Sequence, residues 1–162
     1  MLKPKAINLK ITQPAIIIGS DHAGFKLKLS IKSYLSGLGY KYEDVGAFSE
    51  EASDYPKTAL EVAKKVAKAK SMGILLCGTG IGESIVANKI KGIMAANCFN
   101  EYTAQKSREH NNSNVLCLGA RLLSEGMTKK ITKIWLETKF STEPRHRRRV
   151  NQIREIESNS FK

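Results

Sequence analysis

Short apolar runs alternate with longer stretches of helical periodicity along most of this chain. The apolar runs are mostly rich in Ile, Leu and Val and are bounded by glycine or polar residues, which is typical of strands buried on both faces of a sheet. The expected strands occupy residues 15–19, 40–46, 72–77, 92–98 and 114–119. The expected helices occupy residues 25–39, 56–70, 83–90, 101–112 and 124–140. The pattern therefore predicts strands and helices in alternation.

This alternation determines the expected fold class. A strand, a helix and a second strand in succession normally form a right-handed crossover, which makes the two strands parallel. We expect an α/β protein of one domain, with three layers and a doubly wound, Rossmann-like, mostly parallel sheet of five strands. The expected domain covers residues 15–157 and includes a C-terminal helix, between an N-terminal extension at residues 1–14 and a tail at residues 158–162.

Composition narrows the class of protein further. The chain has 162 residues, of which 41% are hydrophobic and 26% charged, as in ordinary globular proteins. No apolar run approaches the roughly 18–20 residues that cross a membrane, and no secretory signal is visible, so we expect a cytoplasmic protein with no membrane partner. The three cysteines lack the C-x-x-C spacing of zinc sites, and Cys98 and Cys117 are expected to be small buried core residues.

The formal net charge of +12 raises the alternative of a non-catalytic nucleic-acid-binding module. Much of the excess lies near the two ends, in Lys3, Lys5 and Lys10 and in the run "PRHRRRV" at residues 144–150. The rest is spread over the faces of expected helices, where lysines usually contact solvent. Aromatic residues that could stack on bases are not interleaved with the basic runs. We therefore expect no nucleic-acid partner.

The stretch "CGTGIGES" at residues 77–84 carries the first candidate chemistry. Its three glycines are each two residues apart, which does not match the G-x-G-x-x-G pattern of dinucleotide-binding loops. No Gly-Lys-Ser or Gly-Lys-Thr follows, so the stretch is not a Walker phosphate loop either. What remains is a turn with exposed amides at a helix start and the Cys77 thiol beside it. Such a turn can bind an anion and react with it.

Further polar residues follow the other expected strands. In a doubly wound sheet, ligands bind beyond the carboxyl ends of the strands, where the loops that lead into helices converge. Asp21 and His22 follow the first expected strand, Arg121 follows the last, and His110 and Asn111 end a helix. None of the three histidines has the spacing of a metal-binding helix motif, so we expect neither a metal nor another cofactor.

Five ordered motifs give a more specific indication. They are "GSDHAGF", "SDYP", "CGTGIGESIVANK", "SREHNNSNVLCLGAR" and "RHRRRV". With them the chain resembles the type B ribose-5-phosphate isomerases and the related galactose-6-phosphate isomerase subunits, over about residues 16–156. A single glycine loop would be weak support, whereas five motifs in the same order are specific.

The resemblance implies an activity and an assembly. It implies a metal-independent aldose-ketose isomerase that interconverts ribose 5-phosphate and ribulose 5-phosphate through an enediolate, in the non-oxidative branch of the pentose phosphate pathway. The alternative substrates within the family are hexose phosphates, either galactose 6-phosphate or allose 6-phosphate. The family builds its active sites from two subunits, so the resemblance also implies a homodimer at least.

The resemblance assigns the proton-transfer chemistry to three of the loops. By its match to the motif, Cys77 is the base that moves the proton between two carbons, and His110 assists opening of the sugar ring. Asp21 binds sugar hydroxyls and helps to relay protons between oxygens. The oxygen of the enediolate is held by Thr79 and by the amides of Gly78, Thr79, Gly80, Ile81 and Gly82.

The remaining implied residues bind the substrate. His22 and Asn111 contact it, and Tyr55 lines the sugar pocket or is simply the turn residue before Pro56. Arg121, Arg145 and Arg149 match positions that the family uses on the phosphate, which suits guanidinium groups and dianionic oxygens.

Glu83 is a second candidate for the base. Some family members lack the cysteine and use a glutamate at this position, and this chain carries both groups. A first-turn carboxylate that interacts with the helix dipole is the simpler interpretation of Glu83. Cys77 is the preferred base, and its place beside an anion-binding turn predicts a lowered pKa.

Overall fold

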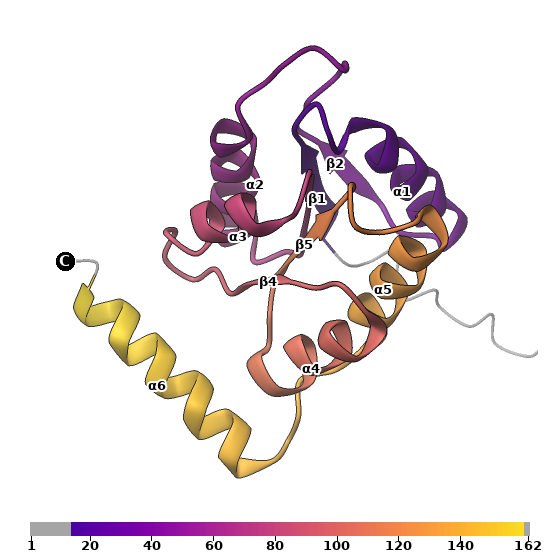
Figure 1. Cartoon of the computed structure of the whole chain (residues 1–162). Helices are drawn as coiled ribbons and strands as arrows, with labels where there is room; N and C mark the ends of the chain where they lie inside the picture. The colour runs from indigo at the N-terminus through magenta and orange to yellow at the C-terminus, as the bar shows by residue number, and fades with distance from the viewer. Residues whose placement is uncertain (1–13, 161–162) are drawn as a thin grey trace, which may run out of the picture.

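A parallel sheet forms the centre of the molecule (Figure 1), in a computed structural model that describes residues 14–160. Within those residues its strands are β1 (Ile16–Ser20), β2 (Tyr42–Asp44), β3 (Gly73–Cys77), β4 (Ala95–Asn97) and β5 (Val115–Gly119). Their order across the sheet is β2-β1-β3-β5-β4, and every neighbouring pair is parallel. The predicted five-stranded sheet is confirmed. The expected N-terminal extension, apart from Pro14, lies outside the described residues.

Helices cover both faces of this sheet. They are α1 (Phe25–Gly37), α2 (Tyr55–Ala69), α3 (Ile81–Ala87), α4 (Glu101–Asn111), α5 (Glu125–Glu137) and α6 (Pro144–Ser160). One apolar cluster joins the sheet to α1, α4 and α5, and a second joins its other face to α2 and α3. The three-layer, doubly wound fold is therefore confirmed.

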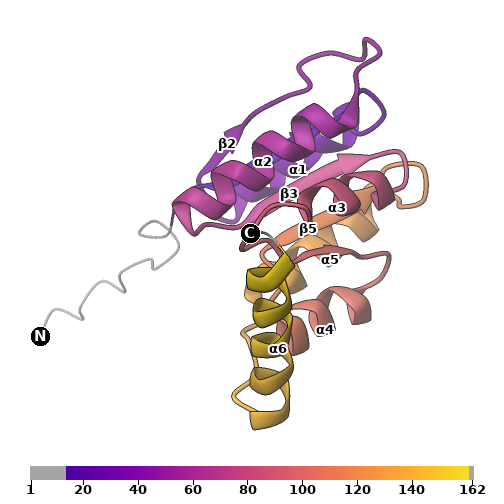
Figure 2. The same ribbon diagram turned by 90° about the vertical axis from the view of Figure 1, so that its left-hand side faces the viewer.

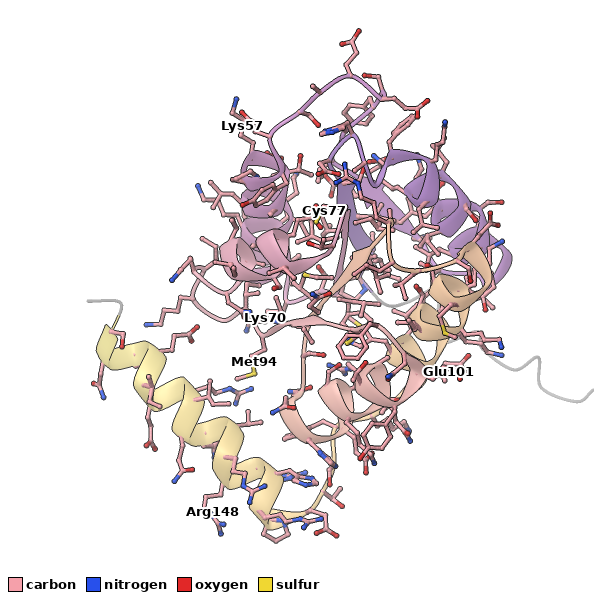
Figure 3. All side chains as sticks on the ribbon, in the orientation of Figure 1. Lys57, Lys70, Cys77, Met94, Glu101 and Arg148 are labelled. Carbon is pink, nitrogen blue, oxygen red and sulfur yellow. The ribbon has the colours of Figure 1, made fainter. Side chains whose placement is uncertain are left out.

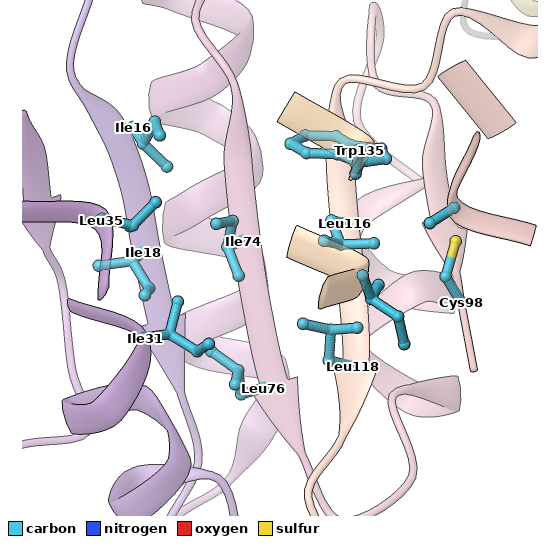
Figure 4. Packing of buried hydrophobic residues seen from close by; sticks show 12 residues of the cluster. Ile16, Ile18, Ile31, Leu35, Ile74, Leu76, Cys98, Leu116, Leu118 and Trp135 are labelled. Atoms are coloured by element: carbon cyan, nitrogen blue, oxygen red, sulfur yellow. The ribbon is translucent and has the colours of Figure 1, made fainter. Parts of the chain in front are cut away.

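The continuous apolar runs in the sequence arise because helices cover both faces of the sheet. In β1, Ile16 and Ile18 point into the first cluster, whereas Ile17 points into the second. Successive side chains of a strand point to opposite faces, so a strand covered on both faces needs apolar residues at every position. Figure 4 shows the first cluster, with Trp135 of α5 packed near Leu116 of β5. The indole of Trp135 donates a hydrogen bond to the Ser113 hydroxyl at 2.8 Å.

The last helix, α6, leaves these layers. It lies beside α4 and runs away from the sheet (Figure 2), with His146 and Val150 buried. Ile153 and Ile156, farther along the same helix, are 43% and 65% exposed. The helix continues to Ser160, so the boundary expected at residue 157 falls inside it. Within residues 14–160, the structure has no helix that is both long enough and apolar enough to span a membrane.

The strand order places the loops that carry function. The chain moves from β1 outward to β2 on one side and returns to β3 on the other side of β1. The loops that follow β1 and β3 therefore diverge from neighbouring strand ends, which leaves a crevice at this switch point. Asp21 follows β1 and Cys77 ends β3, so both lie at this point.

The close approach of α1 to β3 gives a test of the fold. A Cβ atom added at Gly24 would lie 2.0 Å from the Leu76 carbonyl oxygen, whereas one at Gly126 in α5 would meet no atom within 4 Å. We expect Gly24→Ala to lower the free energy of unfolding by about 1–3 kcal/mol or more, because the backbone of β3 must move. Gly126→Ala, the control, is expected to leave it unchanged or raise it by up to about 1 kcal/mol. Urea unfolding midpoints compare the two, and equal midpoints would contradict the close packing.

Candidate active site

The switch point brings the thiol and the first acidic residue together. The amide of Asp21 donates to the Leu76 carbonyl at 3.2 Å, which ties the loop after β1 to the strand that ends in Cys77. One carboxylate oxygen of Asp21 accepts a hydrogen bond from the Gly24 amide at 3.0 Å. Asp21 is thereby fixed beside Cys77, where a carboxylate can exchange protons with a bound ligand.

The glycine loop wraps around the Cys77 sulfur. Gly80 has a φ of +80°, a backbone conformation that favours glycine, and its amide donates to Cys77 Sγ at 3.1 Å. The amide of Ile81 donates to the hydroxyl oxygen of Thr79 at 3.3 Å. The loop therefore holds the sulfur by an amide and presents the exposed Thr79 beside it.

Arg121 closes the site from the end of β5. Its amide donates to the Gly78 carbonyl at 3.0 Å, and a Cβ atom at Gly78 would lie 3.4 Å from the guanidinium group. The guanidinium group therefore lies directly over the glycine loop. A cation in this position can attract an anionic substrate toward the thiol.

Tyr55 and His22 occupy the other sides of the loop. A Cβ atom at Gly82 would lie 2.6 Å from the ring of Tyr55, the first residue of α2, so this ring lies against the loop. The amide of His22 donates to the Ser53 hydroxyl at 3.0 Å, and the Ser53 amide donates to Nδ1 of His22 at 3.2 Å. Nδ1 also lies 3.3 Å from the Ser53 carbonyl, so the backbone of Ser53 holds the imidazole ring in place.

Burial controls the acidity of Cys77. Its side chain is 5% exposed, and burial, followed by the nearby Glu83 and Asp21 charges, raises the pKa of the thiol, while the amides of Gly80 and Thr79 act in the opposite direction. The expectation of a lowered pKa is wrong, because the loss of hydration outweighs the hydrogen bonds from the turn. The resting group is therefore a thiol in neutral solution.

Glu83 is a buried acid behind the thiol. It lies in the first turn of α3, as expected, but its side chain is 0% exposed. Burial and then the Asp21 charge hold the pKa of Glu83 well above its usual range. Neither of its oxygens accepts a hydrogen bond of ordinary length from residues 14–160. Both conditions favour the protonated, neutral carboxyl group.

The structure places the other predicted residues elsewhere. His110 and Asn111 end α4, which follows β4 and leads into β5, so they lie at the amino edge of the sheet. The ring of His110 packs on that of His146 in α6, with ring centroids 4.1 Å apart. Arg145 and Arg149 lie on the same helix, and Figure 3 shows Arg148 of this helix at the lower end of the molecule, away from Cys77. One copy of the chain thus holds the predicted residues in two separate groups.

Asn97 is a site residue that the sequence patterns did not identify. Its amide group donates to the Thr79 carbonyl at 3.4 Å, and its oxygen lies 2.5 Å from where a Gly80 Cβ would be. The available signal was a polar residue at the end of an apolar strand. Within the described part of the chain, no three His, Cys, Asp or Glu side chains are grouped as potential metal ligands.

Comparison with known proteins shows the family of this chain. Residues 16–153 match the model of the Ribose/Galactose Isomerase family. Ribose-5-phosphate isomerase B of Escherichia coli is 44% identical over 88% of this chain and 95% of its own length. D-erythrulose-4-phosphate isomerase of Pectobacterium atrosepticum is 42% identical over 78% of this chain and 84% of its own length.

A solved structure extends the similarity to three dimensions. Ribose-5-phosphate isomerase B of Clostridium thermocellum superposes with a TM-score of 0.88 at 44% identity, covering 91% of this chain and 99% of that one. The fold and the site define a sugar-phosphate isomerase. The chain belongs to the Ribose/Galactose Isomerase family.

The effect of Glu83 on Cys77 can be measured without a substrate. At the alkaline pH where Cys77 ionises, an ionised Glu83 opposes the thiolate, so we expect Glu83→Gln to move the alkylation midpoint of Cys77 to lower pH. Glu61→Gln, an exposed change on α2, is the control and is expected to leave the midpoint in place. Iodoacetamide labelling read by peptide mass spectrometry gives the midpoints. An unchanged midpoint in Glu83→Gln would show that the two groups do not interact.

Proposed function

We propose that this protein interconverts ribose 5-phosphate and ribulose 5-phosphate. The observation that carries the proposal is the Cys77 thiol, held by the Gly80 amide next to Asp21 at the switch point. Aldose-ketose isomerisation needs one base that works on two adjacent carbons and fixed donors for the oxygen charge that develops. This loop supplies both kinds of group, and the relatives named above support the substrate class.

The proposed proton transfer balances within the sugar. Cys77 acts as the thiolate, after its own proton has passed to the carboxylate of Asp21. The thiolate takes the proton from C2 of the aldose, and the electron pair of that bond forms the enediolate as the C1 carbonyl oxygen becomes an anion. The sulfur returns the same proton to C1, Asp21 gives its proton to the C1 oxygen and takes the proton of the C2 hydroxyl, and that proton finally returns to the sulfur. The Gly80 amide already donates to the sulfur and the Ile81 amide to the Thr79 hydroxyl oxygen, so the Thr79 hydroxyl is the donor proposed for the enediolate oxygen.

Other sugar phosphates are the alternative substrates. The family description includes galactose, and one relative is named for a four-carbon sugar phosphate. Turnover of ribose 5-phosphate, galactose 6-phosphate, allose 6-phosphate and erythrulose 4-phosphate under identical conditions tests the proposal. We expect the highest kcat/KM on ribose 5-phosphate. If another of these sugar phosphates has a higher kcat/KM, that sugar phosphate is the substrate instead.

The role of Cys77 as base gives a prediction for turnover. Cys77→Ala should lower kcat by roughly 10²–10⁴-fold, because it removes a general base. KM should change little, since the amides of the loop stay in place. Glu83→Gln is expected to lower kcat much less, because Glu83 lies behind the sulfur and not at the surface of the site. Steady-state kinetics at several pH values provides the comparison, and near-wild-type turnover by Cys77→Ala would refute this role.

We propose further that two copies of the chain complete each site. His110, Asn111, Arg145 and Arg149 lie at the amino edge of the sheet or on α6, whereas Cys77 lies at the carboxyl edge. A second copy can bring its own α4 and α6 to the Cys77 loop. The exposed Ile153 and Ile156 of α6 and the exposed Ile81 and Ile85 of α3 provide apolar surface for such contact. A homodimer is thus the smallest active unit in this proposal, and the same contacts allow larger assemblies.

Phosphate binding by α6 gives the next prediction. Arg145 and Arg149 are one helical turn apart and share a face, whereas Arg148 is displaced from Arg149 by about 100° around the helix. Arg149→Ala should therefore raise KM about tenfold or more, because a charged hydrogen bond to phosphate is lost. Arg148→Ala removes the same charge from the same helix and serves as the matched control. Equal KM values for the two variants would indicate a diffuse effect of charge.

Mixing the variants tests the shared site directly. Cys77→Ala and Arg149→Ala carry their defects in different half-sites, so a mixed dimer contains one site free of both changes. The two variants are mixed in equal amounts and allowed to exchange subunits. Half of the dimers are then mixed, and each has one intact site out of two, so about a quarter of wild-type activity is expected at low substrate concentration. No gain on mixing, with mixed dimers verified by native mass spectrometry, would place both residues in the same chain's site.

A further inference from the structure

A buried lysine outside the catalytic loop is not used by the chemistry described above. Lys28, in the second turn of α1, has a side chain that is 0% exposed. Its ammonium group donates to Asp44 Oδ1 at 2.6 Å and to the Ala47 carbonyl at 2.5 Å. It also lies 5.2 Å from the ring centroid of Phe48. Lys28 therefore connects α1 to the end of β2 and to the loop that follows it.

Asp44 is the partner that keeps this charge buried. Its Oδ1 also accepts the Gly46 amide at 3.0 Å, and its Oδ2 accepts Lys32 at 2.6 Å. Burial alone would raise the pKa of Asp44, but the hydrogen bonds from the two lysines and the amide outweigh it and lower the pKa. A buried ion pair seldom adds much to stability compared with apolar residues of the same size, so its effect is better sought in the geometry that it fixes.

The ion pair between Lys28 and Asp44 holds residues 45–54 in place, a segment here called the β2–α2 loop. Near Lys28, the Gly46 carbonyl accepts the Ser20 amide and the Ala47 amide donates to the Ser20 carbonyl, both at 2.6 Å. Ser20 directly precedes Asp21 of the candidate active site. At the other end of the loop, Ser53 exchanges hydrogen bonds with His22. Both ends of the loop are thus tied to the segment that carries Asp21 and His22.

Between these two anchors, the β2–α2 loop encloses space beside the site. A cavity of about 620 Å³ is lined by His22, by Gly46, Ala47 and Phe48, and by Ser53 and Thr58, among others. His22 lines this cavity and directly follows Asp21 of the candidate active site. A sugar phosphate that reaches from Cys77 past His22 would meet the β2–α2 loop as the wall of its pocket.

We infer that Lys28 is a positioning residue that holds this wall, and that the wall determines which length of sugar phosphate is accepted. The inference rests on the proposed function. Its ligand class is open-chain and cyclic sugar phosphates of four to six carbons. A pocket wall discriminates substrates that differ by one carbon by roughly 10–200-fold, and it does so only when its position is fixed. Lys28 fixes it by bridging Asp44 and Ala47 across the Gly46 turn.

Lys28→Met tests this inference, because methionine fills a similar volume without the bridge to Ala47. Lys32→Met is the matched control, since Lys32 pairs with the same carboxylate and carries the same charge but has no hydrogen bond to the loop. We expect Lys28→Met to raise KM for the preferred substrate about tenfold and to change the ratio of kcat/KM between four-, five- and six-carbon substrates about tenfold. Lys32→Met should change both quantities less than about twofold, because Asp44 keeps its hydrogen bonds from Lys28 and the Gly46 amide, and Lys28 keeps its bond to Ala47.

Hydrogen exchange of the β2–α2 loop gives a readout that does not need activity. Amides of residues 45–54 should exchange at least about tenfold faster in Lys28→Met than in wild type or Lys32→Met, while those of α5 stay unchanged. Asp44→Asn provides a second test if Lys28→Met fails to fold, and the same acceleration is expected. Wild-type protein that turns over none of the sugar phosphates would refute the proposed function, while the exchange measurement would still decide the role of Lys28.

Three outcomes would overturn the inference. The first is unchanged exchange of the loop in both Lys28→Met and Asp44→Asn. The second is an equal rise in KM for Lys28→Met and Lys32→Met, which would indicate only the loss of a positive charge. The third is a fall in kcat with the same ratio among the four-, five- and six-carbon substrates, which would indicate general damage to the site and not a displaced wall.

Discussion

The common direction of the five strands is the constraint on which the rest of the structure depends. Because every strand pair is parallel, residues that follow strands gather at one edge of the sheet and residues that end the crossover helices gather at the other. Asp21 and Cys77 belong to the first group, and His110 belongs to the second. Two groups of residues separated in this way do not meet within one domain of this topology. The proposed sharing between two copies would bring them together.

The acidity of Cys77 and Glu83 follows from their burial at the carboxyl edge of the sheet. Cys77 and Glu83 are both buried beside Asp21, so three acids lie within one region of low hydration. The pKa of both Cys77 and Glu83 is raised, mainly by burial, and the Asp21 charge adds to this effect on both groups. The guanidinium group of Arg121 lies over the glycine loop. In the proposed mechanism, proton transfer would begin from a weakly acidic thiol whose ionisation depends on what binds next to it.

The sequence allowed most of the fold to be predicted, and its motifs supplied the candidate residues of the site. The apolar runs identified the strands because strands covered on both faces leave a continuous pattern, as Ile16, Ile17 and Ile18 illustrate. The motifs singled out Cys77 and its glycine loop as candidates, but they did not indicate the raised pKa of the thiol, because burial is a property of the packed chain. No sequence pattern distinguishes Lys28 from the other lysines, since its burial depends on Asp44, which lies 16 residues farther along the chain.

The projecting helix α6 has a consequence for the free chain. Beyond Val150 this helix presents Ile153 and Ile156 to solvent, and it carries the arginines proposed to bind phosphate. In the proposed assembly, another copy covers this apolar surface, so mass action couples the order of the helix to the protein concentration. In dilute solution the end of α6 would fray toward coil, and the affinity for phosphate would decline with it. The specific activity of such an enzyme is then a property of its concentration as well as of its sequence.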